Sequence, residues 1–455
     1  MKYIAIDIGS SYVKAVVLDV DSDSVVASDK RPTPEKLAHA NPRYFENDAG
    51  VFIQLVQELC ERFVAAYVDV EGILLSTQMH GFVYTIPGMD DIYVSWQDLR
   101  CLDSGPSGQS YLHQLEAIVP PGEMNRAGVY LKPSLGLCNL YALLNIQPKL
   151  PRTGTLHTLG SYIIGKLTGK NICHISNAAP LGMVDIVAGG WNHSLLAKLG
   201  LGEVTLPELA LRDFQPCGSY KVHGREIFVY PDWGDQQIAV LGCLAGGDDA
   251  IINIATGAQV LVPTDDLAFG AYEIRPYFEG GHIRTISNMP AGRGLDVFIR
   301  FLREATQKVH GQGCSSSDIW KAIDDGFVFD PNGIAVDMGI YPVSEKLNGG
   351  SVSGIRPDNL SLSSLFSAAY LDMAKTYWEN IQILRAPEKI NRIVCAGGVS
   401  WKSPHLLEAI TTVSGKKCAL SPMADEVVSG MFQAALICSG KKRTLAESVG
   451  VRLHM

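Results

Sequence analysis

Hydrophobic and polar positions alternate near the start and near the middle of the chain, each time around a short turn. Residues 3–19, YIAIDIGSSYVKAVVLD, predict a strand, a Gly/Ser turn and a second strand. Residues 249–263, DAIINIATGAQVLVP, predict the same arrangement. Two ordinary hairpins would explain these segments, but their likeness also predicts a duplicated architecture of two related halves.

A period of three to four residues marks helices between the strand-like segments. Apolar residues from Phe52 to Phe63 share one helical face, and residues 360–384 behave alike, with Ser361 or Ser363 as the expected N-cap. Strand-like runs, EGILLST at 71–77 and INRIVCAGG at 390–398, alternate with these helices. The pattern therefore predicts an α/β chain.

Composition and charge narrow the function classes. The 455 residues suffice for two domains, and the Gly-rich text at 240–250 is the best candidate boundary. The net charge of −9 argues against nucleic acid as the main partner. We find no signal-peptide pattern and no apolar run of membrane-spanning length, and the ten cysteines form no CxxC pair. These features predict a cytoplasmic protein with reduced thiols.

The first turn has side chains suited to holding phosphate. Gly9 lets the backbone approach a ligand, and the N–H groups and hydroxyls of Ser10 and Ser11 can hold phosphate oxygens. Lys14 adds a positive charge on the return strand, and Asp7 can bind Mg²⁺ directly or through water. A plain hairpin with a polar turn is the alternative for this segment taken alone.

Two further turns of this kind lie in the second half of the chain. IATGAQ contains Thr256 and Gly257, and IVCAGG ends a buried strand at Gly397 and Gly398, shortly before Lys402. A helical pattern follows from about residue 404, and a strand–glycine–helix unit favours a nucleotide phosphate at the helix start. No Walker A sequence occurs. Three such turns in this order are stronger evidence than any one of them.

The order of these turns resembles the FGGY carbohydrate kinases, and the resemblance runs nearly from end to end. It implies two duplicated actin-like ATPase domains, related to ribonuclease H, with ATP in the cleft between them. DIGSS would be the first phosphate motif, IATGAQ the second and CAGG the adenosine motif. Residues 1–245 would form the N-terminal domain, with the sugar site and catalytic Asp, and residues 246–455 the C-terminal domain.

Two segments, STQMHG at 76–81 and SWQDLR at 95–100, resemble the sugar-binding segments of this family. The resemblance implies that the substrate contacts Gln78, Met79, His80, Trp96, Asp98, Arg100, Asn177 and Gln236. His80 would hydrogen-bond hydroxyls. Asp98 and Arg100 could instead hold each other in a local ion pair, and Asn177 could brace a turn.

The resemblance also implies a substrate class. QMHG resembles the ketose kinases of the family, so we expect ATP to phosphorylate a primary hydroxyl of a ketose. Sedoheptulose, giving sedoheptulose 7-phosphate, ranks first, D-xylulose second and other ketoses or polyols third. The chain departs from the family where CNLYAL lacks a Lys and a Trp, and where Ser364 replaces an acidic or amide residue.

Asp235, in WGDQQIAVLG, is the candidate catalytic base. It resembles the family's catalytic Asp and lies between two phosphate-type turns in the chain. It could also cap a helix, or bind Mg²⁺ together with Asp7. A helix N-terminus would favour the anion and keep its pKa low. Phosphoryl transfer passes through a loose transition state, which asks for orientation of the base more than for strong basicity.

Two other classes stay open. One is an actin-like ATPase that works as a chaperone or filament, against which the two sugar segments argue. The other is a sugar-binding regulator without catalysis, against which the intact Asp7 and Asp235 argue. The expected partners are ATP, Mg²⁺ and a sugar, with no nucleic acid and no membrane, and a homodimer is left open.

Overall fold

The computed structural model describes residues 1–210, 212–311, 313–341 and 349–454. It divides the chain into two compact units: Met1–Leu244, Thr264–Ile283 and Asp425–Met455 form the first, and Ala245–Pro263 and Arg284–Ala424 the second. The first segment of the first unit ends at Leu244, within residues 240–250, where the sequence predicted a domain boundary. The return of 264–283 and 425–455 to the first unit was not expected, and the functional division into 1–245 and 246–455 stays a prediction.

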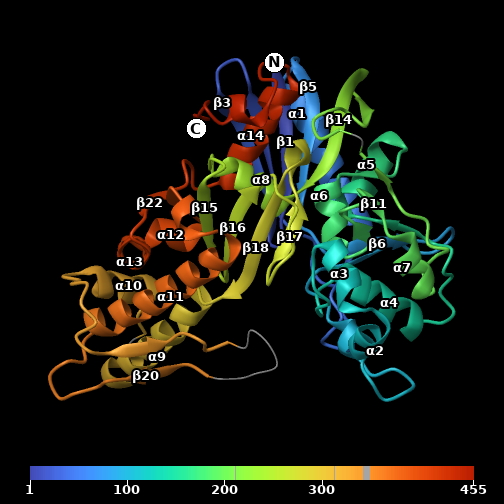
Figure 1. The fold of residues 1–455 in the computed structure, drawn as a ribbon. Coiled ribbons are helices and arrows are strands. Elements are labelled where there is room, and N and C mark those ends of the chain that lie inside the picture. The colour runs from blue at the N-terminus through green and yellow to red at the C-terminus, as the bar shows by residue number, and fades with distance from the viewer. Residues whose placement is uncertain (211, 312, 342–348, 455) are drawn as a thin grey trace. The chain divides into compact units, whose positions relative to one another are not determined.

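Two six-stranded mixed sheets form the framework (Figure 1). The first has the order β13-β14-β5-β1-β2-β3. Its strands are β1 (Lys2–Ile8), β2 (Tyr12–Asp19), β3 (Ser24–Pro32), β5 (Val70–Thr77), β13 (Gly218–Val222) and β14 (Arg225–Gly234). β1 pairs antiparallel with β2 and parallel with β5, and β5 pairs parallel with β14.

The second sheet has the order β17-β18-β16-β15-β21-β22. Its strands are β15 (Asp249–Ile254), β16 (Ala258–Thr264), β17 (Glu273–Pro276), β18 (His282–Met289), β21 (Arg392–Ala396) and β22 (Lys417–Leu420). β15 pairs antiparallel with β16 and parallel with β21, as β1 does with β2 and β5. Both predicted hairpins are confirmed, and the series β3-β2-β1-β5-β14 and β18-β16-β15-β21-β22 repeat one arrangement.

The helices are divided between the two units. The helices of the first unit are α1 (Ala49–Ala66), α2 (Tyr111–Ile118), α3 (Pro121–Ala127), α4 (Gly136–Ile146), α5 (Leu159–Thr168), α6 (Ile175–Ala178), α7 (His193–Lys198), α8 (Asp235–Gly242), α14 (Glu426–Cys438) and α15 (Leu445–Ser448). Those of the second are α9 (Gly292–His310), α10 (Ser316–Asp324), α11 (Leu362–Leu384), α12 (Gly398–Lys402) and α13 (Pro404–Ser414). Ser361 caps α11, which confirms one of the two expected caps.

Smaller sheets and 3₁₀ turns complete the chain. A four-stranded sheet has the order β4-β7-β6-β8, with β4 (Glu46–Asp48), β6 (Phe82–Thr85), β7 (Ile92–Val94) and β8 (Thr155–His157). Three strand pairs are β9 (Ile172–Cys173) with β12 (Glu208–Leu209), β10 (Val184–Asp185) with β11 (Gly190–Trp191), and β19 (Ala335–Asp337) with β20 (Ser351–Ser353). The 3₁₀ turns are η1 (Arg100–Leu102), η2 (Ala179–Leu181), η3 (Phe278–Gly280) and η4 (Pro387–Lys389).

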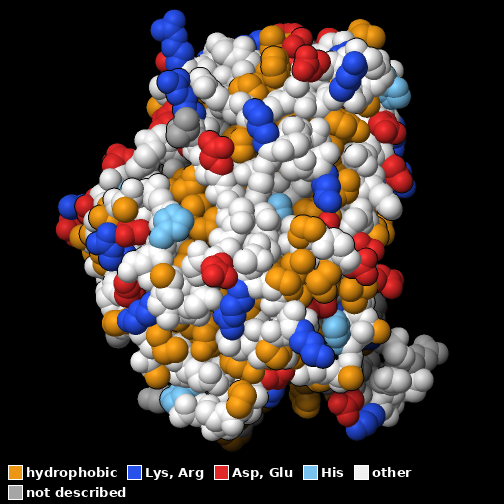
Figure 2. Space-filling model, turned by 90° about the vertical axis from the view of Figure 1, so that its right-hand side faces the viewer, with side chains coloured by type: hydrophobic (Ala, Val, Ile, Leu, Met, Phe, Trp, Pro, Cys, Tyr) orange, Lys and Arg blue, Asp and Glu red, His pale blue; other side chains and the backbone are white. Residues whose placement is uncertain are grey.

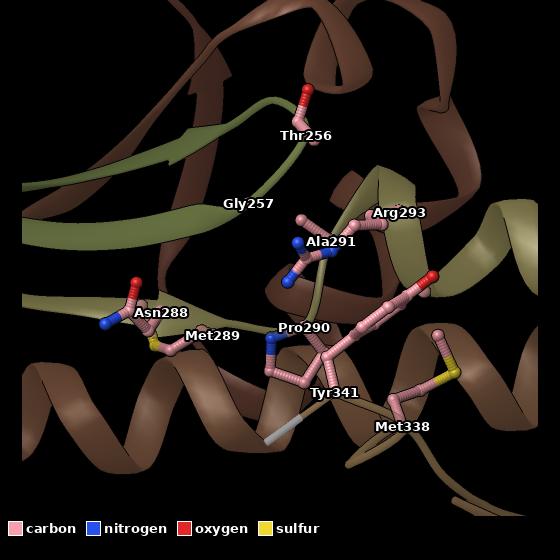
Figure 3. Close-up of a pocket in the computed structure, with 10 residues that line it drawn as sticks. Thr256, Gly257, Asn288, Met289, Pro290, Ala291, Arg293, Met338 and Tyr341 are labelled. Atoms are coloured by element: carbon pink, nitrogen blue, oxygen red, sulfur yellow. The ribbon is translucent and has the colours of Figure 1, made fainter. Parts of the chain in front are cut away.

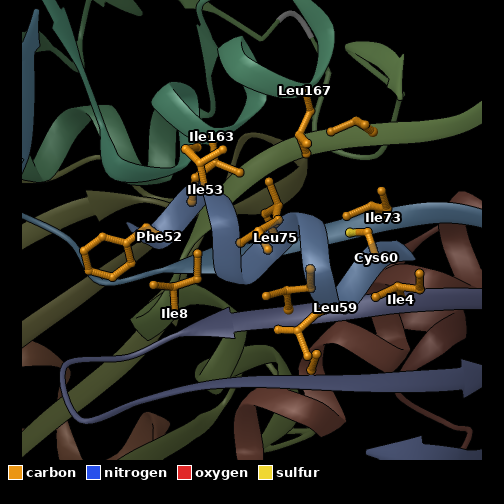
Figure 4. Packing of buried hydrophobic residues seen from close by; sticks show 14 of the residues in the cluster. Ile4, Ile8, Phe52, Ile53, Leu59, Cys60, Ile73, Leu75, Ile163 and Leu167 are labelled. Carbon is orange, nitrogen blue, oxygen red and sulfur yellow. The ribbon is translucent and has the colours of Figure 1, made fainter. Parts of the chain in front are cut away.

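Alternate residues of β1 face two different helical layers. Ile4, Ile6 and Ile8 pack in a core with the predicted apolar face of α1 and with α5 (Figure 4). Tyr3 and Ala5 face the other way, into a core that contains residues of α8 and α14. Because side chains of a strand alternate, Asp7 lies on the same face as Tyr3 and Ala5. The fold therefore directs Asp7 toward α8 and α14.

Helices α8 and α14 cross with their backbones almost in contact. A Cβ atom on Gly242 would lie 1.7 Å from the carbonyl oxygen of Glu426, and one on Gly430 would lie 1.9 Å from that of Ile238. The hydroxyl of Ser429 donates to the carbonyl of Gly242 at 3.0 Å. Only glycine allows this approach. The contact brings residues 425–438 into the first unit.

The surface mixes charge types. On the face shown in Figure 2, acidic and basic side chains are interspersed among neutral and hydrophobic ones. In the described part of the chain, no helix has both the length and the apolar character that crossing a membrane requires. All ten cysteines are free thiols.

Candidate active site

The carboxyl ends of three parallel strands bring together residues that are far apart in sequence. The register pairs Asp7 of β1 with Ser76 of β5, and Thr77 of β5 with Gly234 of β14. Asp235 follows β14 directly as the first residue of α8. Ligands of α/β sheets bind at the carboxyl ends of the strands. This edge of the first sheet is therefore the candidate active site.

Asp235 lies in the first turn of α8, one residue after the N-cap Gly234. Its Oδ1 accepts the N–H of Gln236 at 2.8 Å. Burial raises the pKa of Asp235 to about 6, although that N–H group and the charge of Arg275 oppose the rise. The expected low pKa is wrong because loss of solvent outweighs the helix dipole. At pH 7 the carboxylate is still mostly ionised.

Gly234 is required for the sharp entry into α8. A Cβ atom there would lie 2.5 Å from Oε1 of Gln237, 2.7 Å from Sδ of Met79 and 3.0 Å from the carbonyl oxygen of Ser176. Met79 is thus packed against the start of the helix that carries Asp235. The structure therefore brings the QMHG segment and Asp235 together.

Asp7 lies among further charged groups. Lys14 is its cross-strand partner and forms an ion pair with Asp425, the N-cap of α14. Burial and the charges of Asp235 and Asp425 raise the pKa of Asp7 to about 7. Oδ1 of Asp7 is buried and accepts no hydrogen bond from the described residues. No sequence motif indicates Asp425, because it comes near Asp7 only through the packing of α14.

These carboxylates fit a cation that also has other ligands. No group of three or more His, Cys, Asp or Glu side chains in the described ranges is arranged to hold a metal ion alone. Mg²⁺ does not need such a group, because one or two carboxylates, water and substrate phosphates usually complete its shell. The unpaired Oδ1 of Asp7 and its acidic neighbours match that donor chemistry.

The turn after β1 leaves its hydroxyls at the surface. Gly9 donates its N–H to the carbonyl of Tyr12 at 3.0 Å, and Thr33 donates its hydroxyl to the carbonyl of Gly9 at 2.8 Å. Ser10 and Ser11 are both exposed. The turn is therefore held by its own backbone, and its polar side chains are accessible to a ligand.

The second turn lines two cavities of the second unit. Thr256 and Gly257 border a cavity of about 100 Å³ together with Arg293, whose guanidinium lies 4.0 Å from the ring centroid of Tyr341 (Figure 3). Thr256 also lines a larger cavity of about 930 Å³. That cavity includes two further predicted ATP-binding residues, Gly398 and Lys402.

Gly397 adopts a conformation that only glycine can supply here. Its φ is +82°, and a Cβ atom would lie 2.4 Å from Oδ1 of Asn253 and 2.5 Å from the carbonyl oxygen of Ile254. The turn after β21 thus lies directly against the end of β15, which leads into the turn that holds Thr256. Packing brings the second and third predicted turns together around the larger cavity.

The first predicted sugar segment follows β5. Gln78 is 5% exposed and donates its N–H to the carbonyl of Ile8 at 3.1 Å. His80 has a φ of +68°, and its Nδ1 lies 2.7 Å from the carbonyl oxygen of Pro180. Trp96, from the second segment, is 37% exposed. Its contact with a sugar stays a prediction.

Asp98 and Arg100 form the local ion pair that was one of the two alternatives. Oδ1 of Asp98 accepts Nε of Arg100 at 2.9 Å, and its Oδ2 accepts Nη2 at 2.7 Å. Glu46 binds the same Nη2 at 2.5 Å. The side chains of Asp98 and Arg100 are 0% and 1% exposed, so they hold the loop after Trp96.

Asn177 is a buried brace. Its Nδ2 donates to Oγ1 of Thr77 at 2.5 Å and to Oδ2 of Asp232 at 2.7 Å. Asp232 is fully buried, and burial raises its pKa to about 6. The amide of Asn177 thus ties the end of β5 to β14. This is a structural role, the alternative to a sugar contact.

A charged network beside Gln236 was missed in the sequence. Arg275 of β17 donates from Nη1 to Oε1 of Gln236 at 2.7 Å and from Nη2 to Oε2 of Glu273 at 2.6 Å. Lys132 binds the other oxygen of Glu273 at 2.6 Å. Arg275 begins the run RPYFEGG, but two charged residues at alternate positions of a short strand do not by themselves indicate a buried network.

Comparisons with known proteins agree with this arrangement. Residues 2–250 match the N-terminal domain of the FGGY family of carbohydrate kinases. Human sedoheptulokinase is 25% identical over 359 residues, which cover 66% of this chain and 68% of that protein.

Solved structures share the fold over nearly the whole chain. A xylulose kinase from Rhodospirillum rubrum has a TM-score of 0.85 at 16% identity and covers 100% of this chain and 93% of its own. A gluconate kinase from Lactobacillus acidophilus has a TM-score of 0.83 at 16% identity, with coverages of 99% and 92%. The expected actin-like, ribonuclease H-like fold of two domains is confirmed. The chain belongs to the FGGY family of carbohydrate kinases and is a sugar phosphotransferase.

Proposed function

We propose that this chain transfers the γ-phosphoryl group of ATP to a primary hydroxyl of a ketose, with sedoheptulose ranked first and D-xylulose second. The observation that carries the proposal is the position of Asp235. It starts α8 next to Met79, and its charge acts on Asp7, the other predicted metal ligand. The likeness to human sedoheptulokinase supports the ranking.

Asp235 is the proposed base for the acceptor hydroxyl. The hydrogen bond from the N–H of Gln236 to Oδ1 orients the carboxylate, and its second oxygen is available for the hydroxyl proton. A base with a pKa near the working pH serves proton transfer well, and the pKa of about 6 meets that condition. The rest of the acceleration comes from positioning and charge neutralisation.

Asp7 is the proposed Mg²⁺ ligand, with Asp235 nearby. Bound Mg²⁺ would neutralise charge on the transferring phosphates. The hydroxyls of Ser10 and Ser11 would hold phosphate oxygens at the first turn, and Lys14 would join them once released from Asp425.

The second unit supplies the proposed nucleotide site. Its larger cavity, of about 930 Å³, is of the size that ligand pockets have, and Thr256, Gly398 and Lys402 line it. Gly257 and Gly397 hold the two turns beside it. Ten free thiols and a need for ATP support the cytoplasm as the compartment.

Release of ADP tests the proposal. The purified chain is incubated with ATP and Mg²⁺ and with sedoheptulose, D-xylulose, other ketoses, polyols or no sugar. We expect turnover that depends on a ketose and is fastest with sedoheptulose. ATP hydrolysis that ignores the sugar would favour an actin-like ATPase, and sugar binding without turnover would favour a regulator.

A further inference from the structure

Arg275 is buried, but one of its donors has no partner. The side chain is 4% exposed, and Nη1 and Nη2 are bonded to Gln236 and Glu273. Nε of Arg275 is also buried and finds no acceptor among the described residues. An unsatisfied donor of a buried charged group is costly and calls for a ligand atom or a functional reason.

The backbone holds Arg275 firmly beside the candidate base. Ile274 donates its N–H to the carbonyl of Gly128 at 2.9 Å, and a Cβ atom on Gly128 would lie 2.0 Å from the carbonyl oxygen of Ile274. Nε2 of Gln237 donates to the carbonyl of Pro276 at 3.1 Å, which ties β17 to α8. Arg275 therefore has little freedom to turn away from the start of α8.

His80 supplies an acceptor in the same neighbourhood. Its Nδ1–H donates to the carbonyl of Pro180, so the neutral ring keeps a lone pair on Nε2. Burial and the charges of Lys132 and Arg275 lower the pKa of His80 well below its usual value. The ring is therefore neutral at pH 7, and Nε2 is an acceptor.

The charges around these two residues balance. Lys132 and Arg275 are cations, and Glu273 and Asp235 are anions. An anionic sugar would therefore bring an uncompensated negative charge, whereas a neutral sugar would not.

We propose that Arg275 binds the substrate, with its Nε–H donating to one oxygen of a neutral, polyhydroxylated sugar while Nε2 of His80 accepts from a neighbouring hydroxyl. Glu273 is a positioning residue, because its Oε2 accepts from Nη2 of Arg275, and Lys132 binds the other oxygen of Glu273. The proposal rests on the proposed function for the place of the sugar. It adds the donor and the charge class, and it names Nε2 as the atom of His80 that accepts.

Arg275→Lys tests the donor, because it keeps the positive charge and removes the planar Nε–H. We expect the KM for sugar to rise roughly 10- to 100-fold while the KM for ATP stays unchanged. Arg225→Lys is the matched control. Arg225 also bonds through its guanidinium, to the carbonyls of Val64, Tyr67 and Val70, and has no part in the site.

Each kinetic result decides the role of Arg275. A sugar KM that rises in Arg275→Lys but not in Arg225→Lys supports the proposal, provided that both variants melt at similar temperatures. An unchanged sugar KM in Arg275→Lys overturns it and leaves the proposed kinase activity standing. If Arg275→Lys does not fold, two variants of His80 test the proposed acceptor. His80→Gln keeps an acceptor and His80→Phe removes it, and the KM for sugar and the KM for ATP are compared in the same way.

Calorimetry without nucleotide separates binding from catalysis. We expect sedoheptulose or D-xylulose to bind the wild-type chain and gluconate, which carries a carboxylate, to bind at least 10-fold more weakly. Gluconate binding as tightly as the ketoses overturns the charge class. Ketose binding that Arg275→Lys weakens supports the inference even if turnover is absent, in which case only the proposed function fails. A wild-type chain that binds none of these sugars overturns both.

Discussion

The hydroxyl of Ser176 accepts the backbone N–H of Gly234 at 3.1 Å, one residue before Asp235. Behind it, the ring of His174 lies between Ser176 and Asp213, with Nδ1 2.7 Å from Oγ and Nε2 2.8 Å from Oδ1 of Asp213. When Nε2–H donates to Asp213, Nδ1 accepts both the hydroxyl and the N–H of Ser176. This chain of hydrogen bonds from Asp213 through His174 and Ser176 holds Gly234 at the start of α8.

Ser176→Ala should therefore slow catalysis more than it unfolds the protein. It removes the acceptor of the Gly234 N–H, and we expect kcat to fall about 10-fold with the KM for ATP unchanged. The free energy of unfolding should fall by about 1 kcal/mol. Ser448→Ala is the control, because Ser448 is equally buried and its hydroxyl donates to the carbonyl of Leu445, outside the candidate site. Equal kcat values in the two variants would contradict a positioning role.

Asp235→Asn tests the base directly. The amide keeps the shape of the carboxylate but cannot take a proton, so kcat should fall roughly 10²- to 10⁴-fold. Nucleotide affinity, measured by calorimetry, should survive. Asp185→Asn is a carboxylate control in the same unit, where Asp185 pairs with Arg126 at 2.5 Å. Near-normal turnover of Asp235→Asn would remove Asp235 from the role of base.

The part of this site that the sequence predicted is local in the chain. The turns at Gly9 and Thr256 follow from alternation that ends in small polar residues, and each hairpin closes over a few residues. The order of three such turns identified the family. The start of α8 could also be predicted from the sequence, because Gly234 and Asp235 precede an apolar helical run.

What the sequence could not predict depends on packing between distant segments. Lys14 and Asp425 are 411 positions apart, and they meet only because glycines let α14 cross α8 closely. The pKa of Asp235 follows from burial, which no motif encodes. Arg275 and Gln236 are 39 positions apart, and they meet only in the folded chain.

Asp7→Asn should stabilise the metal-free protein while removing activity. Burial and neighbouring carboxylates raise the pKa of Asp7 to about 7, so the folded state holds this proton more tightly than the unfolded chain. The group's contribution to stability is complete below its usual pKa near 4 and is lost as pH rises through 7. At pH 8 the ionised side chain costs at most on the order of 4 kcal/mol.

Urea unfolding in the presence of EDTA measures this effect. We expect Asp7→Asn to be more stable than the wild type at pH 8, with a clearly smaller difference at pH 5. Added Mg²⁺ should stabilise the wild type and leave the variant unchanged, which links the same carboxylate to the ion. Equal stability of the two proteins at pH 8 would mean that Asp7 is not under electrostatic strain.

Glu273 should make the fold sensitive to acid. Burial alone would raise its pKa, but the charges of Arg275 and Lys132 lower it to about 2. A carboxylate with a lowered pKa stabilises the folded state above its usual value, near 4.5, and this contribution is lost as pH falls from there toward 2. The full contribution is about 3 kcal/mol.

Glu273→Gln should therefore lose less stability than the wild type between pH 6 and pH 3, as measured by urea unfolding. Glu304→Gln, which removes an exposed partner of Lys308, should follow the wild-type curve. If Glu273→Gln shows the same acid dependence as the wild type, the Lys132–Glu273–Arg275 network does not hold its charges together in solution.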